Sequence, residues 1–235
     1  MGEHTVTSFD EDLAQIDRLI RDMGDLAGVM TQDATRALLK SDNALAQRVI
    51  SDDTIMDAKQ RDLDEKAITL IGKRQPMAQD LRAVVGGIRM ASDLERIGDL
   101  AKNIAKRVGA VGESATPRSL THSIDAMAQM VLVQVKSVVE RYVEREADAL
   151  TKLRDEDEKI DVHYTSVFRE LLTYMMEDPR NITACTHLLF CAKNLERIGD
   201  HVTNIAENAY YVLTGEQLPV QRPKLDETQM MTSAG

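Results

Sequence analysis

Hydrophobic residues recur at intervals of three or four along most of the chain, which is the spacing of one face of an amphipathic α-helix. One such run near the start of the chain comprises Leu13, Ile16, Ile20, Met23, Ala27 and Met30. Another, past the middle, comprises Ile124, Met127, Val131, Val135, Val138 and Tyr142. The pattern therefore predicts long helices, and we expect an all-α fold.

Short breaks rich in capping and turn residues divide the pattern into six long helices. The predicted spans are residues 9–40, 43–73, 76–109, 118–150, 156–177 and 179–213, with a kink near Ser51 and Asp52 in the second span. Pro76 and Pro179 are expected to open the third helix of each group of three. Short connections make consecutive helices antiparallel neighbours.

The expected architecture is a tandem repeat of two antiparallel three-helix bundles. The first bundle is assigned to residues 1–113 and the second to residues 114–215, with the linker at Ser114–Pro117. Gly215 is expected to stop the last helix. The remaining residues, 216–235, contain two prolines and are predicted to be disordered.

One motif in the chain is duplicated. The string Leu94–Asp99 recurs unchanged 101 residues later as Leu195–Asp200. Across the longer windows 91–107 and 192–208, ten of seventeen positions are identical, whereas the rest of the two halves matches sparsely. This pattern indicates an internal duplication in which one set of side chains has been kept.

The retained side chains form a line of oxygen donors. Glu95, Asp99 and Asn103 follow at i, i+4 and i+8, so they lie along one face of a helix. The same spacing recurs in the second half of the chain at Glu196, Asp200 and Asn204. Two carboxylates at i and i+4 repel each other by ~0.2–0.5 kcal/mol, and a bound cation would turn that cost into a gain.

A second acidic pair precedes each line on the preceding helix. Asp53 and Asp57 are spaced by four, and 104 residues later Asp157 and Asp161 repeat that spacing. Each half therefore offers four carboxylates and an amide from two helices. We expect the two helices to bring them to one place.

The distances from the turns support that expectation. Asp57 lies 19 residues before Pro76, and Glu95 lies 19 residues after it. In the second half, Asp161 lies 18 residues before Pro179 and Glu196 lies 17 after it. Since a helix rises ~1.5 Å per residue, both motifs of each half are level in an antiparallel pair.

An ordinary salt-bridged surface is the alternative. Arg96 and Arg197 each precede the second acid of the line by three residues, where a helix ion pair forms readily. A single such motif is usually a solvated face. The duplication, with the asparagine retained on the same line, favours a binding site.

Composition adds a soluble, cytoplasmic location to this picture. The chain has a formal charge of −10, no Trp and few aromatics, which favours helix over strand and argues against nucleic-acid binding. The polar stretch Met1–Asp12 does not resemble a signal peptide, and no apolar stretch reaches the ~18 residues of a membrane span. Cys185 and Cys191 are expected to be reduced core thiols.

With these motifs, the chain resembles the PhoU family, the phosphate-transport-system accessory regulators of bacteria. The resemblance covers almost the whole length and rests on Leu-Glu-Arg-Ile-Gly-Asp followed by Asn-Ile-Ala in both halves. Further matches are Arg74-Gln75-Pro76 with Asp80-Leu81-Arg82, and Glu177–Asn181.

The resemblance implies metal clusters on the acidic motifs, with iron, zinc, magnesium or manganese as the candidates. All-oxygen ligation suits hard ions better than copper, and zinc usually prefers nitrogen or sulfur. The ligands implied by the resemblance are Asp53, Asp57, Glu95, Asp99 and Asn103 in one site, and Asp157, Asp161, Glu196, Asp200 and Asn204 in the other.

The resemblance also implies a non-enzymatic regulator that restrains phosphate uptake and the phosphate-starvation response. Its implied partners are the ATPase of the phosphate ABC transporter and a phosphate-sensing histidine kinase, so that it meets the membrane only through them. A homodimer is expected as well.

Other classes and roles stay open. A purely structural helical adaptor would carry the acids as a solvated face, and a carboxylate-bridged metal enzyme is the weaker alternative. A ferritin-like oxidase needs Glu-x-x-His, and no histidine here has a glutamate three residues before it. His201 replaces Leu100 of the first copy and is a ligand, a neighbour of the site or a surface residue. Arg82 is expected to pair with an acid of a neighbouring helix, and contact with an anion is the alternative.

Overall fold

A computed structural model of the chain describes residues 2–111 and 118–218, and their regular secondary structure is entirely helical. The long helices are α1 (Gly2–Lys40), α2 (Asn43–Arg74), α3 (Gln79–Ala105), α5 (Arg118–Val143), α6 (Ala147–Glu177) and α7 (Ile182–Thr214). Two short elements are α4 (Val108–Val111) and the 3-10 turn η1 (Pro179–Asn181). The prediction of an all-α fold with six long helices is confirmed.

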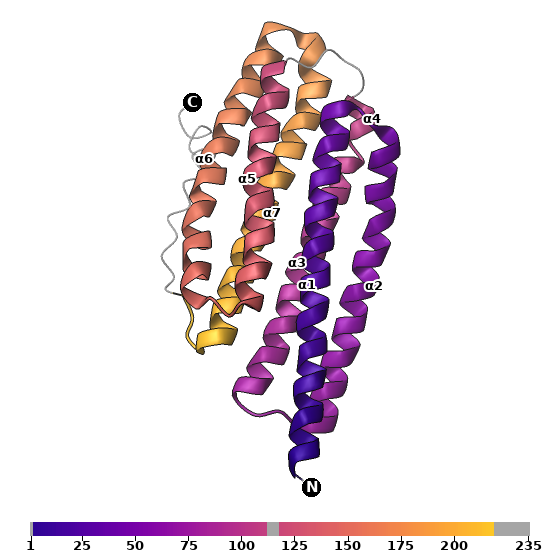
Figure 1. The fold of residues 1–235 in the computed structure, drawn as a ribbon. Helices are drawn as coiled ribbons and strands as arrows, with labels where there is room; N and C mark the ends of the chain where they lie inside the picture. The colour runs from indigo at the N-terminus through magenta and orange to yellow at the C-terminus, as the bar shows by residue number, and fades with distance from the viewer. Residues whose placement is uncertain (1, 112–117, 219–235) are drawn as a thin grey trace.

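The helices form two groups of three that lie side by side (Figure 1). Helices α1, α2 and α3 pack on one another, as do α5, α6 and α7, while α1 runs along α5 and α3 along α7. The α2–α3 turn and the α6–α7 turn lie at opposite ends of the molecule in Figure 1. The two third helices, α3 and α7, are therefore antiparallel where they meet.

Two of the predicted segments fall largely outside these residues. The linker at 114–117 and the tail from residue 219 onward lie outside the described residues, and the domain boundary at 113/114 stays a prediction. Within the part of the chain that the structure describes, no helix is long and apolar enough to span a membrane.

The predicted apolar seams form the core. The α1 residues from Ile16 to Met30 that carry the seam are fully buried, and so is the α5 seam from Ile124 to Val138. The duplicated helices bury Leu94 and Ile97 on α3 in the same way. Burial of each such side chain stabilises the fold by about 1.5–3 kcal/mol.

Glycines allow the two groups of helices to approach closely. A Cβ at Gly24 of α1 would overlap Val139 of α5, and a Cβ at Gly86 of α3 would overlap Val212 of α7. These contacts join elements from opposite halves of the chain. The interface between the halves is therefore part of the packed core.

The α5–α6 connection differs from its prediction. Helix α5 ends at Val143, not near residue 150, and α6 begins at Ala147, not near residue 156. The chain turns at Arg145, whose φ of 60° is left-handed although the residue is not glycine. Arg145 also donates a hydrogen bond of 3.0 Å to Asp17 of α1, so a tertiary contact holds a turn that lacks the usual turn residues.

Two further boundaries depart from prediction. Helix α3 begins at Gln79, not at Pro76, because Gln75 and Ala78 take left-handed φ values of 49° and 44°. Pro179 opens the 3-10 turn and α7 follows it. Helix α2 continues through Ser51, whose hydroxyl donates to the carbonyl of its own helix at Arg48, 2.7 Å away.

Candidate functional site

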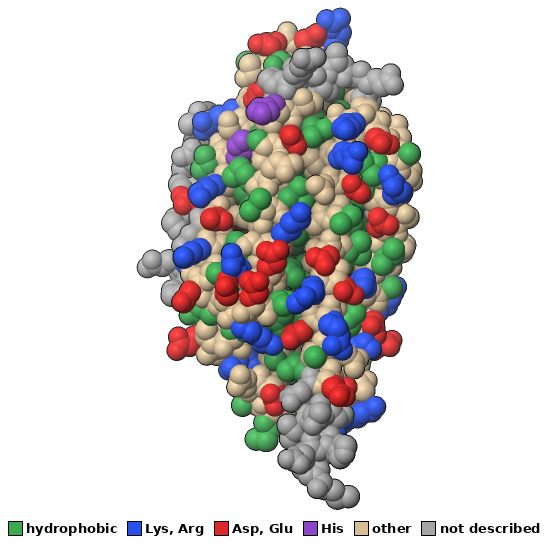
Figure 2. Space-filling view, in the orientation of Figure 1, with side chains coloured by type: hydrophobic (Ala, Val, Ile, Leu, Met, Phe, Trp, Pro, Cys, Tyr) green, Lys and Arg blue, Asp and Glu red, His purple; other side chains and the backbone are tan. Residues whose placement is uncertain are grey.

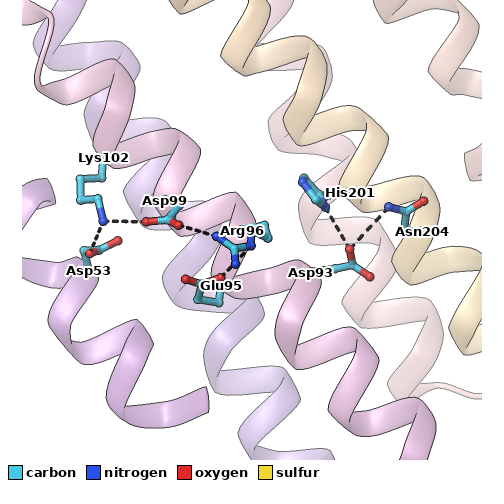
Figure 3. A network of polar contacts seen from close by, with 8 residues as sticks. All are labelled: Asp53, Asp93, Glu95, Arg96, Asp99, Lys102, His201 and Asn204. Atoms are coloured by element: carbon cyan, nitrogen blue, oxygen red, sulfur yellow. Dashed lines mark hydrogen bonds and ion pairs between the residues drawn. The ribbon is translucent and has the colours of Figure 1, made fainter. Parts of the chain in front are cut away.

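The acidic residues of the first half meet between α2 and α3 (Figure 3). Asp53 of α2 is 8% exposed and faces α3, where Asp99 lies on the predicted acidic line. The ammonium of Lys102 lies between them, donating to Asp53 Oδ2 and to Asp99 Oδ1 at 2.6 Å each. The lysine thus joins Asp53 of α2 to Asp99 of α3, while the assignment of these acids as metal ligands stays a prediction.

The charges within this cluster shift one another. Burial alone would lower the pKa of Lys102, but its hydrogen bonds to Asp53 and Asp99 outweigh that effect and raise it. Burial likewise raises the pKa of Asp99, and the hydrogen bond and charge of Lys102 reverse this and lower it. Both groups are accordingly held in their charged forms.

Glu95 lies one turn before Asp99 on the same line. Burial raises the pKa of its carboxyl, and the negative charges of Asp99 and Asp57 raise it further. Arg96 Nε lies 3.4 Å from Glu95 Oε2, yet that buried oxygen accepts no hydrogen bond from the described residues. One carboxylate oxygen of the first cluster is thus desolvated without a hydrogen-bond donor.

The second half has a related group of acids between α6 and α7. Asp157 is 6% exposed, and its Oδ1 lies against the α7 backbone, 2.9 Å from where a Cβ on Gly199 would stand. Glu196 is 8% exposed and accepts a 2.8 Å hydrogen bond on Oε1 from Lys193. Its Oε2 is buried and accepts none from the described residues, as in Glu95.

Burial dominates the electrostatics of Glu196. It raises the pKa of the carboxyl, Lys193 offsets part of that rise, and the charges of Asp200 and Asp161 add to it. The charge of Asp161 on α6 therefore acts on Glu196 across two helices. Each half thus presents a partly or fully buried glutamate beside further acids.

The asparagines of the line do not join the acids in this way. Asn103 is exposed. Asn204 points its Nδ2 at Asp93 Oδ1 of α3, 3.5 Å away, on the side of α3 away from Lys102 (Figure 3). His201 Nδ1 lies 2.9 Å from the same oxygen, so its contact is an inter-helix pair with Asp93.

Arg82 differs from its expected pairing with an acid. Its Nε donates to the carbonyl of Val212 at 3.4 Å, and its guanidinium lies over the ring of Tyr211 at 5.6 Å. It thus contacts the last turns of α7. The two cysteines are buried and unpaired, as predicted, and burial raises the pKa of Cys191 to about 12.

Lys102 is the residue of the first cluster that the sequence reasoning missed. Two signals could have revealed it: its spacing of three from Asp99, which suits an ion pair, and its place within the duplicated window at a position where the copies differ. The carboxylate of Asp53 completes the contact from another helix. Only the packed structure shows that partner.

The donor set suits a hard cation in its chemistry. Carboxylate oxygens make up each cluster, and one buried oxygen each of Glu95 and Glu196 accepts no hydrogen bond from the described residues. Across residues 2–111 and 118–218, however, no three His, Cys, Asp or Glu side chains converge as a ready-made metal site. The residues present fit a metal only if carboxylate side chains rotate toward it, so the ligand set stays a prediction.

Charged side chains of both signs cover the visible face of the molecule, with acidic ones gathered about its middle (Figure 2). No broad basic surface spreads across this view. Surfaces that bind the phosphate backbone of nucleic acids are basic. This face and the formal charge of −10 therefore argue against nucleic-acid binding.

The fold and the clusters define a class: an all-helical tandem-repeat protein that carries a related acidic cluster in each repeat. The model of the PhoU domain matches the chain twice, over residues 20–108 and 124–209. The chain belongs to the PhoU family. The two matches also bear out the predicted repeat.

Relatives of similar length are close in sequence. A phosphate-specific transport system accessory protein PhoU homolog from Rhizobium meliloti is 57% identical over 98% of this chain and 97% of its own length. The homolog of the same description from Caulobacter vibrioides is 47% identical over 96% of this chain and 98% of its own length.

Solved structures agree in fold. The crystal structure of PhoU from Pseudomonas aeruginosa is similar with a TM-score of 0.85 and 33% identity, over 88% of this chain and all of that one. The phosphate transport system regulatory protein PhoU from Streptococcus pneumoniae gives a TM-score of 0.83 at 26% identity, over 90% of this chain and all of that one. The chain is thus an accessory protein of phosphate-specific transport, from a non-enzymatic family.

Proposed function

We propose that the chain is a metal-binding cytoplasmic regulator of phosphate uptake and of the phosphate-starvation response. In this proposal it acts as an adaptor between the ATPase of the phosphate ABC transporter and a phosphate-sensing histidine kinase, as a homodimer. The observation that carries the metal-binding part is a pair of buried glutamate oxygens at equivalent positions. Glu95 Oε2 and Glu196 Oε2 each accept no hydrogen bond from the described residues.

The physical argument starts from the cost of these groups. An unsatisfied charged oxygen away from water costs more than the ~1–3 kcal/mol of an unsatisfied neutral one. The two repeats have diverged in sequence, yet each keeps a glutamate oxygen without a hydrogen bond at the same position. We infer from this that both repeats bind the same kind of ligand. Iron, zinc, magnesium and manganese remain candidates, and the oxygen donors favour the harder ions.

A bound metal would supply positive charge at each cluster. The residues that would hold it are the two aspartates of the second helix with the glutamate and aspartate of the third helix in each half. A cation shared by these residues would link α2 to α3 and α6 to α7, and so would stiffen each bundle. A stiff pair of bundles is a suitable surface for protein partners.

The proposed partners are those that the resemblance to the PhoU family implies. The Streptococcus pneumoniae relative is described as a regulatory protein of the phosphate transport system, which supports a regulatory role here. A pull-down with the purified transporter ATPase tests the adaptor part independently of metal. Retention of the ATPase on the chain is expected, and absence of binding at micromolar concentrations would contradict it.

Metal content tests the site. Replacing Glu95, Asp99, Glu196 and Asp200 together by alanine should abolish the metal found by elemental analysis of protein purified without affinity metals, because the acids that attract the cation are gone. The matched control replaces four exposed acids elsewhere: Asp25, Glu65, Glu140 and Asp148. Full metal content in the first variant would refute the ligand assignment.

A structural adaptor without metal is the second candidate. The ion pairs of Lys102 with Asp53 and Asp99 favour it, because an internal cation already neutralises part of one cluster. This alternative predicts no metal after purification and no change in melting temperature on chelation. The regulator proposal predicts a lower melting temperature after chelation.

A further inference from the structure

Exposed hydrophobic side chains gather at the turn ends of the two helical hairpins, α2–α3 and α6–α7. Twelve large hydrophobic side chains of the described residues are exposed, and seven of them lie in these two places. The first apolar surface, near the α2–α3 turn, comprises Ile68, Met77, Leu81 and Val85. The second apolar surface, near the α6–α7 turn, comprises Leu172, Met176 and Ile182. Single exposed apolar residues are ordinary, whereas a group of them marks an interaction site.

The duplication repeats these surfaces on the third helix of each half. Leu81 precedes Asp99 by eighteen residues, and Ile182 precedes Asp200 by the same eighteen. Eighteen residues make five helical turns, so each apolar side chain lies on the same face of its helix as the acid. The identity of the residue has changed between the copies, but its hydrophobic character and its exposure have not.

The second helix of each half shows the same repetition. Ile68 follows Asp57 by eleven residues, and Leu172 follows Asp161 by eleven. Eleven residues are close to three turns, so these apolar side chains also share a face with the acids. They lie outside the window in which the copies are strongly alike. An exposed apolar residue kept at the same place in two otherwise diverged copies indicates a shared use.

The two helices of a hairpin contribute to one surface. Met56 of α2 packs on Gly98 of α3, where its Cγ lies 3.2 Å from the position of an added Cβ. Because α2 and α3 are antiparallel, Ile68, twelve residues further along α2, is level with residue 86 of α3. Ile68 therefore lies beside Val85. The equal spacings of the second half give its surface the same construction.

Each apolar surface continues along its hairpin into an acidic cluster. Two cations accompany the four carboxylates of each cluster, Arg96 and Lys102 in the first and Lys193 and Arg197 in the second. Four negative and two positive charges leave each cluster with a formal charge of −2. Along α3 the acids begin ten residues after the last residue of the apolar surface, a distance of ~15 Å.

We propose that each apolar surface, together with the acidic cluster beside it, is a docking site for an amphipathic helix of a protein partner. The helix that fits carries apolar side chains at one end, and lysine or arginine about ten residues further along, opposite the acids. Burial of the apolar side chains supplies affinity, and the complementary charges fix the direction of the helix. Since the two turns lie at opposite ends of the molecule (Figure 1), the chain offers two such sites. The inference rests on the proposed adaptor function.

Binding of the purified transporter ATPase to the full chain, measured by calorimetry, tests the two surfaces. L81D with I182D should weaken this binding at least about tenfold, because the new charges would have to be desolvated in the complex. M77D with M176D should also weaken it. Met77 and Met176 are 80% and 85% exposed, so this second pair leaves the packing of the free protein intact.

The matched control is V29D with V133D. Val29 of α1 and Val133 of α5 are exposed apolar residues outside both surfaces. This variant adds the same two charges and should bind the ATPase as the unchanged chain does. Melting temperatures of all three variants should stay close to that of the unchanged chain.

Photo-cross-linking identifies the bound segment. A benzoylphenylalanine placed at position 77 or at position 176 should cross-link to the same segment of the ATPase, whereas one at position 133 should give no cross-link. Mass spectrometry of the cross-linked peptides should find a helix with apolar residues at one end and basic residues further along. A cross-link to an acidic segment would overturn the proposed chemistry.

The remaining outcomes separate this inference from the proposed function. ATPase binding that survives both L81D with I182D and M77D with M176D would overturn the docking sites and leave the adaptor function standing. No ATPase binding by the unchanged chain would contradict the adaptor function, and the inference would fall with it. Conversion of a dimer to a monomer by L81D with I182D, seen by sedimentation, would assign the surfaces to a second copy of the chain and overturn the inference.

Discussion

At the scale of single residues, two equivalent glutamates hold the least favourable charges of the described molecule's acidic clusters. Glu95 and Glu196 are desolvated, and neighbouring carboxylates face them from the adjoining helix. The hydrophobic residues next to each glutamate are packed in the core and hold its helix in place. The carboxylate therefore cannot become fully solvated without disturbing that packing. The free-energy cost of ionising these two carboxyl groups depends on pH.

The pH dependence follows from the sign of the shift. Burial raises the pKa of Glu196 above its usual 4.5, so the folded protein binds that proton more readily than the unfolded chain does. The stabilising contribution is therefore complete below about pH 4.5 and is lost as pH rises through the raised pKa. At neutral pH the ionised carboxylate opposes folding.

We predict that Glu196→Gln makes the metal-free protein more stable at pH 7 relative to pH 5 than the unchanged protein is. The reason is that glutamine carries no proton to lose across that interval. Urea unfolding at pH 5, 6 and 7 gives the free energy of unfolding, and Glu140→Gln on an exposed acid is the control. Equal pH slopes for E196Q and the unchanged protein would contradict the prediction.

At the scale of elements, close helix packing depends on glycines where the two halves meet. Gly86 of α3 lies against Val212 of α7, and a side chain there would overlap the valine. Gly72 of α2, in contrast, has open space around its Cβ position. Both are helical, so their difference isolates packing from helix propensity.

We predict that Gly86→Ala lowers the free energy of unfolding by about 1–3 kcal/mol, because the α3–α7 contact must open. Gly72→Ala should raise it by ~0.5–1 kcal/mol, because alanine favours the helix and meets nothing. Urea or thermal unfolding measures both. Equal effects of the two substitutions would show that the α3–α7 approach is not close.

The element boundaries show what local signals miss. The left-handed Arg145 is held by Asp17 of α1, which is distant in sequence, so a turn forms where no turn residue stands. The Pro76 connection likewise extends to Gln79, because Gln75 and Ala78 both take positive φ angles that end one helix and delay the next. Local propensity therefore predicts that a break occurs, while tertiary contacts place its ends.

At the scale of the whole molecule, the two bundles do not behave as independent units. Tyr142 of α5 donates a 2.6 Å hydrogen bond to Asp17 of α1, and His201 of α7 lies 2.9 Å from Asp93 of α3. The packed contacts at Gly24 and Gly86 lie between the same pairs of helices. Each half therefore completes its core on the other.

We predict that the fragment of residues 1–113, produced alone, has no cooperative unfolding transition as a monomer. It would expose the α1 and α3 faces that α5 and α7 cover, so it should either associate or unfold gradually. Circular dichroism during urea titration, with size-exclusion chromatography, tests this, and the full chain is the control. A monomeric fragment with a sharp transition would contradict it and support independent domains.

The sequence alone determined the helices, the apolar seams and the duplicated acidic lines, because period, capping and repeated spacing are local properties of a chain. It also predicted that Asp57 and Glu95 lie level, because equal residue counts from a turn translate into equal heights on antiparallel helices. Residue counts could not predict the direction in which each side chain of the clusters points.

The tertiary structure decided the partners: Lys102 between two acids, Asn204 turned toward Asp93, and Arg82 on the carbonyl of Val212. The reason is that one residue can choose among several neighbours only after helices distant in sequence have packed. Sequence spacing states which face a side chain lies on. The packed structure shows which charged group, carbonyl group or aromatic ring contacts that side chain.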